Sequence, residues 1–197
     1  MTASLRERKK AQTKNRMAEA AVSILIDEGP EAATITAITE QAGVSVRTFH
    51  NYFTTREEAF TYYIRQFFNQ IGEAIRAYPI KTSAVELMQD VLWQNLAETS
   101  GDMKTSYHVM SIAERLGLSV LSRDKNYPSS MFYDLGEILH QKMDGELSRY
   151  QAYLICHLTV SAAASAMEAY ISGELTTDRD MRHLFDEAFD LLRRGIH

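Results

Sequence analysis

Four polar side chains that can form hydrogen bonds fall within the five consecutive residues from Arg47 to Asn51. If this segment is helical with Phe49 buried, a rotation of about 100° per residue points Arg47 and Asn51 to the opposite side and leaves Thr48 and His50 on the flanks. A guanidinium can bind guanine O6 and N7 or a phosphate, a carboxamide can pair with adenine N6 and N7, and a threonine methyl fits the thymine methyl. These side chains therefore predict contact with duplex DNA.

Two short helices joined by a turn would hold these side chains in place. Thr34 is a suitable N-cap for a helix that carries Ile35 and Ile38, and Ser45 is a suitable N-cap for the helix that follows. Gly43 ends the first helix and can adopt the positive φ that a helix-turn-helix junction needs. Helices of fewer than about ten residues are marginal alone, so these two must pack on neighbours.

The N-terminal segment is strongly basic in a chain whose net charge is −5. Residues 1–16 hold six Lys and Arg residues against one acid, Glu7. Such a segment predicts a local contact with a polyanion, and a solvated, frayed terminus is the alternative.

Apolar residues elsewhere recur at helical spacing, and no segment has the alternation of a strand. The first helix is expected from Thr13 until Gly29 and Pro30 end it. After residue 54, helices are expected at 55–77, 84–98, 103–118, 131–143, 146–171 and 178–194. The sequence therefore predicts an all-α protein of about nine helices. A DNA-binding helix-turn-helix domain with a basic N-terminal arm would occupy residues 1–54 and would be joined by a shared helix to the remainder, 55–197.

Membrane and disulfide-stabilised proteins do not fit the sequence. No apolar run approaches the length needed to cross a bilayer, and the charged N-terminus lacks the apolar stretch of a signal peptide. The single cysteine, Cys156, rules out an internal disulfide and offers no metal-ligand spacing, so we expect it to be a small buried hydrophobe. We therefore expect a cytoplasmic protein with no membrane partner.

An enzyme is the competing class. Glu137 and His140 have the spacing of one di-iron ligand pair, but a bundle site needs two such pairs and further glutamates. Cys156 and His157 point about 100° apart on a helix, which denies the thiol its base. We expect neither catalysis nor a metal or cofactor. An all-helical protein-binding scaffold would leave the basic arm and the polar side chains near Arg47 unexplained.

Many positions between Thr13 and Phe60 have the residue types and spacing of one family. They are Arg16, Ala20-Ala21, Gly29, Thr34-Ile35, Ile38, Ala42-Gly43-Val44-Ser45, Thr48-Phe49, Tyr52-Phe53, Arg56-Glu57 and Ala59. This stretch resembles the N-terminal domain of TetR-family transcriptional regulators. Thr39 departs from the usual alanine between the two helices, and Arg56 replaces the usual lysine at the start of the fourth helix.

The resemblance implies phosphate contacts at Thr34 and Arg56. The full set of expected DNA-binding residues is Arg6, Arg8, Lys9, Lys10, Thr34, Thr36, Ser45, Arg47, Thr48, His50, Asn51 and Arg56.

The resemblance also implies a dimeric, ligand-responsive repressor whose last two helices pair across a two-fold axis. Small residues from Ser161 to Ala166 permit close approach of another helix, and apolar residues from Met181 to Leu192 form a stripe on the final helix. The alternative is that both surfaces are buried in the monomer, although a protein that binds a palindrome needs two copies. The expected interface residues are Ala162, Ser165, Ala166, Ala169, Leu184, Phe185, Ala188 and Leu192.

Methionine and aromatic residues gather between residues 88 and 133. Flexible Met side chains suit varied apolar ligands, and Trp, Tyr and His add polar tips that orient a ligand. The alternative is an ordinary core, because such stripes at helical spacing are more often buried packing. The layout from Arg115 to Pro128 resembles regulators with acyl-CoA-like ligand domains. The expected effector-binding residues are Met88, Trp93, Met103, Tyr107, His108, Met110, Glu114, Arg115, Met131, Phe132 and Tyr133.

These features together predict a regulator that binds a palindromic operator in double-stranded DNA as a homodimer and acts as a repressor. A small, largely apolar or aromatic effector would release it by moving the helix that starts near Thr55, because this movement changes the separation of the two recognition helices. A transcriptional activator is the alternative.

Overall fold

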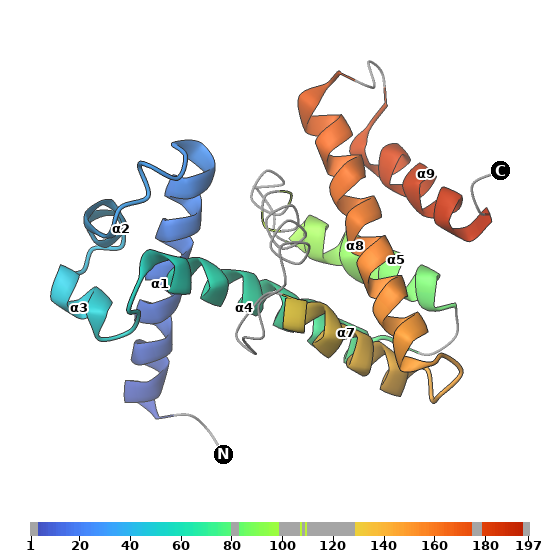
Figure 1. Cartoon of the computed structure of the whole chain (residues 1–197), viewed down its shortest axis with the longest axis horizontal. Helices are drawn as coiled ribbons and strands as arrows, with labels where there is room; N and C mark the ends of the chain where they lie inside the picture. The colour runs from blue at the N-terminus through green and yellow to red at the C-terminus, as the bar shows by residue number, and fades with distance from the viewer. Residues whose placement is uncertain are drawn as a thin grey trace. The chain divides into compact units, whose positions relative to one another are not determined.

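The computed structural model of the chain describes residues 4–79, 83–98, 107, 109, 129–174 and 179–194. Every regular element in these ranges is a helix, as the sequence predicts (Figure 1). The eight helices within the described ranges are α1 (Leu5–Asp27), α2 (Ile35–Gln41), α3 (Val46–His50), α4 (Arg56–Ala77), α5 (Ala84–Glu98), α7 (Ser129–Lys142), α8 (Arg149–Ser172) and α9 (Met181–Arg194). The helix expected at 103–118 lies outside the described residues apart from Tyr107 and Val109.

The basic N-terminal segment is helical from Leu5, well before the start predicted at Thr13. A capping box begins the helix: the Ser4 hydroxyl accepts a hydrogen bond from the Glu7 amide at 3.3 Å, and the Glu7 carboxylate accepts one from the Ser4 amide at 2.7 Å. These bonds satisfy amide groups that the first turn leaves without helical partners, and they lower the pKa of Glu7. From Leu5 onward the basic segment is therefore the first turns of α1 and not a frayed arm.

Packing divides the chain into an N-terminal unit, Met1–Gln66, and a C-terminal unit, Phe67–His197. Helix α4, Arg56–Ala77, spans the boundary between the two units. The division predicted after residue 54 coincides with the start of α4, whereas the division by packing falls within this helix.

The N-terminal unit has its own apolar core, formed by one face of α1 and the inner sides of α2, α3 and the start of α4. Its buried members are Met17, Ala18, Ala20, Ala21, Ile24, Ala33, Ile38, Ala42, Phe49, Phe53 and Ala59. At the edge of this core, the Lys14 ammonium lies over the ring of Tyr62, 4.2 Å from its centroid, and the Tyr62 hydroxyl donates to Asn15 at 2.8 Å. Lys14 and Tyr62 thus join α1 to α4.

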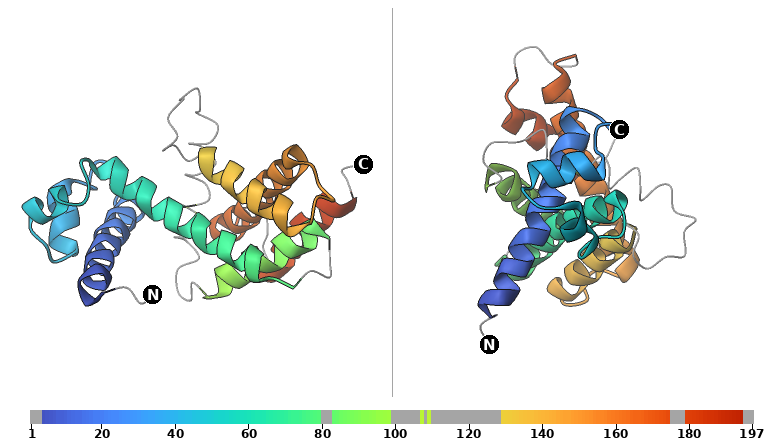
Figure 2. Two further views of the ribbon diagram at one scale, coloured as in Figure 1. Left: turned by 90° about the horizontal axis from the view of Figure 1, so that it is seen from below. Right: turned by 90° about the vertical axis from the view of Figure 1, so that its left-hand side faces the viewer.

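In the C-terminal unit, α8 packs against α5, α7 and α9 (Figures 1 and 2). By length and composition α8 is apolar enough to cross a bilayer, contrary to our expectation that no such run exists. Its buried residues, among them Ala152, Cys156, Ala163 and Met167, nevertheless form part of the core of this unit. Its apolar composition is therefore accounted for by helix packing.

Helices α7 and α8 form a tight hairpin. Between them Asp144 and Gly145 adopt positive φ values of 48° and 80°. Further along, a Cβ atom added to Gly136 on α7 would come within 2.9 Å of the Tyr153 Cα on α8. The absence of a side chain at residue 136 is what lets the two backbones approach this closely.

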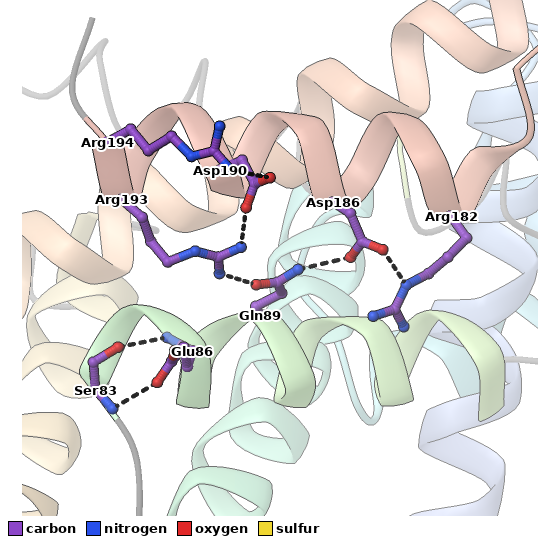
Figure 3. A network of polar contacts seen from close by, with 8 residues as sticks. All are labelled: Ser83, Glu86, Gln89, Arg182, Asp186, Asp190, Arg193 and Arg194. Carbon is purple, nitrogen blue, oxygen red and sulfur yellow. Dashed lines mark hydrogen bonds and ion pairs between the residues drawn. The ribbon is translucent and has the colours of Figure 1, made fainter.

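A polar network joins α5 to α9 (Figure 3). Gln89 of α5, which is buried, donates from Nε2 to the Asp186 carboxylate at 2.7 Å and accepts at Oε1 from Arg193. On α9 itself, Asp186 pairs with Arg182 and Arg193 pairs with Asp190. The buried amide therefore has partners at both ends, as a buried polar group requires.

Candidate nucleic-acid interface

The turn between α2 and α3 has the predicted caps and junction. The Thr34 hydroxyl accepts from the Ala37 amide at 3.2 Å, and the Ser45 hydroxyl accepts from the Thr48 amide at 3.1 Å. Gly43 has a φ of 63°, the left-handed conformation that glycine adopts without steric cost. Both N-caps and the helix-turn-helix geometry are therefore confirmed.

Thr39, which departs from the alanine usual at this position, lies buried between α2 and α3. Its hydroxyl donates to the Thr36 carbonyl at 2.9 Å, and its own carbonyl accepts from the Val44 amide at 3.0 Å. The extra hydroxyl is therefore hydrogen-bonded within its own helix, so the substitution leaves no unsatisfied polar group in the core.

Helix α3 presents a polar surface on the side opposite Phe49, which is fully buried and packs on Phe53. Arg47, His50 and Asn51 are exposed. Asn51 is the residue that caps the C-terminus of α3, because the helix ends at His50. The exposed guanidinium, imidazole and carboxamide are the groups that can contact base edges.

Thr48 is less accessible than the other three. It is half-buried, and its hydroxyl oxygen lies 2.9 Å from that of Ser45. Thr34, Thr36 and Ser45 are exposed. The Thr34 and Ser45 hydroxyls accept amide hydrogen bonds as caps, and a hydroxyl that accepts at its oxygen retains a hydrogen that it can donate to a phosphate.

An open surface groove lies between the basic start of α1 and the end of α3. Its lining residues are Arg6, Lys9, Lys10, Thr13, Asn51 and Tyr52. The four from α1 occupy positions i, i+3, i+4 and i+7 and therefore share one helix face. Arg8, by contrast, is exposed on another face and is absent from the groove lining.

Sequence reasoning missed Thr13 and Tyr52 in this groove and grouped Arg8 with the other three basic residues. The capping-box pattern at Ser4 and Glu7 was the available signal, because it would have extended the helix to Leu5 and separated Arg8 from the groove face.

Arg56, expected to contact a phosphate, is bound to the protein itself. Its Nη1 donates to the carbonyls of Pro30 at 2.7 Å and Ala33 at 3.2 Å, and its Nε donates to the Glu57 carboxylate at 2.9 Å. The hydrogen bond from Arg56 is the main cause of the lowered pKa of Glu57. Arg56 therefore joins the start of α4 to the loop between α1 and α2.

The expected effector-binding residues that the structure describes pack against different helices. Trp93 on α5 packs against α9, with its ring 5.3 Å from that of Phe185 and 4.6 Å from the Arg182 guanidinium. Phe132 on α7 is buried and stacks on His157 of α8 at 4.2 Å. Met88 and Met131 are also buried, and Tyr107 is half-buried. Met103, His108, Met110, Glu114 and Arg115 lie outside the described residues.

Tyr133 does not belong to an enclosed pocket, contrary to our expectation. Its side chain is 63% exposed and stacks on Tyr153 of α8 with the ring centroids 4.6 Å apart. The residue follows Phe132 on α7, and a rotation of about 100° takes it from the buried face to the surface.

The expected dimer-interface residues also need correction. Phe185 is 0% exposed in the single chain, and Leu184 and Ala166 are buried, because α9 packs on α5 and α8. These three belong to the core of the subunit. Ala162, Ala169, Ala188 and Leu192 are half-buried, and Ser165 is exposed.

Large apolar side chains that sequence reasoning missed are exposed on the same two helices. Leu158 on α8 is 46% exposed and Leu191 on α9 is 54% exposed, and Leu154 is also exposed. No signal in the sequence separates them from core leucines, because they have the same residue type and occur in equally apolar helices.

The residues considered for an enzyme site make ordinary structural contacts. Glu137 pairs with Arg149 at 2.8 Å, and a ring nitrogen of His140 lies 2.6 Å from the Leu147 carbonyl. Cys156 is buried, and burial raises the pKa of its thiol to about 12. Within the ranges that the structure describes, no three His, Cys, Asp or Glu side chains are grouped to hold a metal ion.

A helix-turn-helix whose second helix is exposed beside a basic helix face defines a DNA-binding protein. Residues 18–62 match the family model for bacterial regulatory proteins of the tetR family. The chain therefore carries the N-terminal helix-turn-helix domain of TetR-family transcriptional regulators.

Solved structures share this fold over nearly the whole chain. A transcriptional regulator from Rhodococcus sp. Rha1 has 17% identity and a TM-score of 0.65, covering 92% of this chain and 96% of that one. The fatty acid degradation regulator FadR from Bacillus halodurans has 18% identity and a TM-score of 0.62, covering 91% and 94%. A putative fatty acid metabolism regulator from Clostridium perfringens has 15% identity and a TM-score of 0.59, covering 92% and 98%. A comparison with curated protein sequences gave no match.

Proposed function

We propose that the protein is a ligand-responsive repressor that binds a palindromic operator as a homodimer in the cytoplasm. The groove that joins the basic face of α1 to Asn51 at the end of α3 carries this proposal, because it puts phosphate-binding and base-contacting groups on one surface. Arg6, Lys9 and Lys10 bind phosphates in this account.

The exposed residues of α3 provide the sequence preference. Arg47 and Asn51 contact base edges in the major groove, with His50 and Thr48 beside them. The hydroxyls of Thr34 and Ser45 and the exposed Thr36 lie at helix starts, where phosphates bind well.

Two copies of the chain pair through α8 and α9. Leu154 and Leu158 continue along α8 towards the small residues at 162, 165 and 169, and Leu191 provides an apolar side chain on α9. Exposed apolar side chains grouped on two adjacent helices are typical of an oligomer interface. A dimer would place two copies of α3 about one turn of DNA apart, roughly 34 Å.

The effector is a small, largely apolar or aromatic molecule bound in the C-terminal unit. The methionine and aromatic residues of this unit support the proposal, as do the printed names of the relatives from Bacillus halodurans and Clostridium perfringens, which concern fatty acids. Because α4 is continuous between the two units, a shift of α4 on binding would change the separation of the recognition helices.

The Asn51→Ala variant tests the DNA-binding surface. Loss of the carboxamide should weaken binding to the preferred duplex by about 1 to 3 kcal/mol and relax the preference at one base position. Gel-shift titration over a randomised site measures both quantities, with Gln94→Ala, an exposed change on α5, as the control. Unchanged affinity and preference would remove Asn51 from the interface.

The Leu158→Arg variant tests the dimer. A buried, unpaired guanidinium at the two-fold interface should convert the dimer to a monomer, as measured by sedimentation equilibrium. Tyr133→Arg, which changes an exposed aromatic residue on α7, should leave the dimer intact. A dimeric Leu158→Arg protein would place the interface elsewhere.

Thermal-shift screening with fatty acids, acyl-CoA esters and aromatic compounds tests the effector. A compound at about 100 times its dissociation constant should stabilise the protein by about 2.7 kcal/mol and should also weaken operator binding. A compound that stabilises the protein and leaves DNA affinity unchanged would not be an effector.

A further inference from the structure

We infer that Arg56 is a positioning residue that aligns the helix-turn-helix with α4 and is not a phosphate ligand; this inference rests on the proposed DNA-binding function. Three observations support this inference. They are the protein acceptors already bound by its guanidinium, the neighbouring charge of Glu57, and the position of the two carbonyl acceptors next to α2.

The Arg56 guanidinium is already occupied on two of its three nitrogen atoms. Nη1 donates to the Pro30 and Ala33 carbonyls, and Nε donates to Glu57, so three of about five N–H groups have protein acceptors. Bidentate binding of a phosphate needs two parallel donors, either Nη1 with Nη2 or Nε with Nη2. In each of these pairs, one nitrogen already donates to an acceptor within the protein.

The charge of Arg56 is also partly balanced within the protein. The Glu57 carboxylate lies 2.9 Å from Nε, and the pKa of Glu57 is lowered, so this carboxylate is ionised at neutral pH. A phosphate approaching Arg56 would meet the negative charge of Glu57 at the same place. By contrast, the three basic residues of the α1 groove face have no such acidic neighbour among the groove-lining residues.

The two carbonyl acceptors lie where they control the start of α2. Ala33 is fully buried and immediately precedes Thr34, which caps α2. Helix α2 in turn holds the turn to α3 through the bond from the Val44 amide to the Thr39 carbonyl. The Arg56 bonds therefore fix the orientation of the helix-turn-helix relative to the first turn of α4.

This arrangement predicts that Arg56 affects specificity without contributing a phosphate contact. A misaligned α3 would lose base contacts, whereas the phosphate contacts made by α1 would persist. Loss of the Arg56 bonds should therefore weaken binding to the preferred duplex and leave non-specific binding almost unchanged.

The experiment measures affinity against salt concentration for two duplexes of equal length, one selected by the wild-type protein from a random pool and one of unrelated sequence. Arg56→Ala should bind the selected duplex at least about tenfold more weakly, the smallest factor that one charge-assisted hydrogen bond represents, with a salt slope within about half a unit of wild type. Lys10→Gln, in the groove, is the matched control and should flatten the slope by about 0.9 for both duplexes.

Arg56→Lys provides the rescue. An ammonium can donate to both the Pro30 and Ala33 carbonyls, so this variant should regain the preference for the selected duplex. Circular dichroism of each variant establishes that α-helix content is retained. If Arg56→Ala does not fold, the Arg56→Lys and Arg56→Gln variants test the inference instead. The carboxamide of Arg56→Gln can donate to the loop but carries no charge. A positioning role therefore predicts a wild-type salt slope for Arg56→Gln.

Three outcomes would overturn the inference. They are a slope flattened by about 0.9 in the uncharged variants, an equal loss of affinity for both duplexes, and an unchanged preference for the selected duplex in Arg56→Ala. A wild-type protein that binds no duplex would instead refute the proposed function.

Discussion

Gln89 on α5 donates a hydrogen bond of 2.7 Å to Asp186 on α9, across 97 residues of sequence (Figure 3). The Oε1 atom of the same carboxamide accepts a hydrogen bond from Arg193, so one buried side chain contacts both an acidic and a basic residue of α9. The pair of bonds sets the position of α9 along α5. Because α9 also carries Leu191, this position affects the surface proposed for dimerisation.

The Gln89→Leu variant should be less stable than wild type by about 1 to 2 kcal/mol, because an apolar side chain leaves Asp186 and Arg193 without their buried partner. Urea unfolding followed by the fluorescence of the single tryptophan, Trp93, measures the loss at one fixed protein concentration. Gln94→Leu, an exposed change on the same helix, is the control. Equal midpoints for the two variants would show that the network adds no net stability.

Alanine at Gly136 should destabilise the C-terminal unit by about 1 to 3 kcal/mol, because the new Cβ would overlap the Tyr153 backbone. Gly72→Ala is a matched comparison: its new Cβ would meet the Ile138 side-chain terminus at 2.9 Å, and this terminus can rotate away. We therefore expect a smaller loss at Gly72, offset by the higher helix propensity of alanine. A Gly136→Ala protein as stable as Gly72→Ala would contradict the close helix approach.

Arg6→Gln should flatten the dependence of log affinity on log salt by up to about 0.9, because Arg6 lines the groove beside Asn51. Arg8→Gln removes the same charge from another face of α1 and should change the slope less. Fluorescence anisotropy with a labelled duplex at several salt concentrations measures both slopes. Equal slopes for the two variants would mean that the groove face does not set the phosphate contacts.

Cys156 should be unreactive in the native protein. Burial raises the pKa of its thiol from 9.0 to about 12, so at about pH 8 almost no thiolate is present and the sulfur is inaccessible. The stability that this group contributes is present below the ordinary pKa and is lost as the pH rises from about 9 towards 12. A chromogenic disulfide reagent should react in urea but not with the folded protein, and equally fast reaction in both would contradict the burial.

Local signals in the sequence predicted much of this fold. The caps at Thr34 and Ser45, and both ends of α5, depend on residues within one helical turn of each boundary, so the chain itself specifies them. The positive φ of Gly43 was predictable for the same reason. The predicted start of α1 at Thr13 was wrong, because the capping box of Ser4 and Glu7 starts the helix at Leu5.

Contacts between distant residues could not be predicted in this way. Arg56 donates a hydrogen bond to the backbone carbonyl of Pro30, 26 residues earlier. Every residue has such a carbonyl, so the residue type does not indicate which one is the acceptor. Phe185 lies on an apolar stripe of α9, yet such a stripe does not tell whether its own subunit or a partner covers it. The structure assigns Phe185 to the core of the subunit.

The most direct test of the account is selection from a pool of random duplexes by the purified protein, followed by sequencing of the bound fraction. We expect enrichment of an inverted repeat whose half-site centres lie about one helical turn apart, since two copies of α3 would contact successive major grooves. The Asn51→Ala protein should enrich the same repeat with one position relaxed in each half. Retention of duplexes without any enriched sequence, or enrichment of a single unrepeated site, would contradict a dimeric operator-binding regulator.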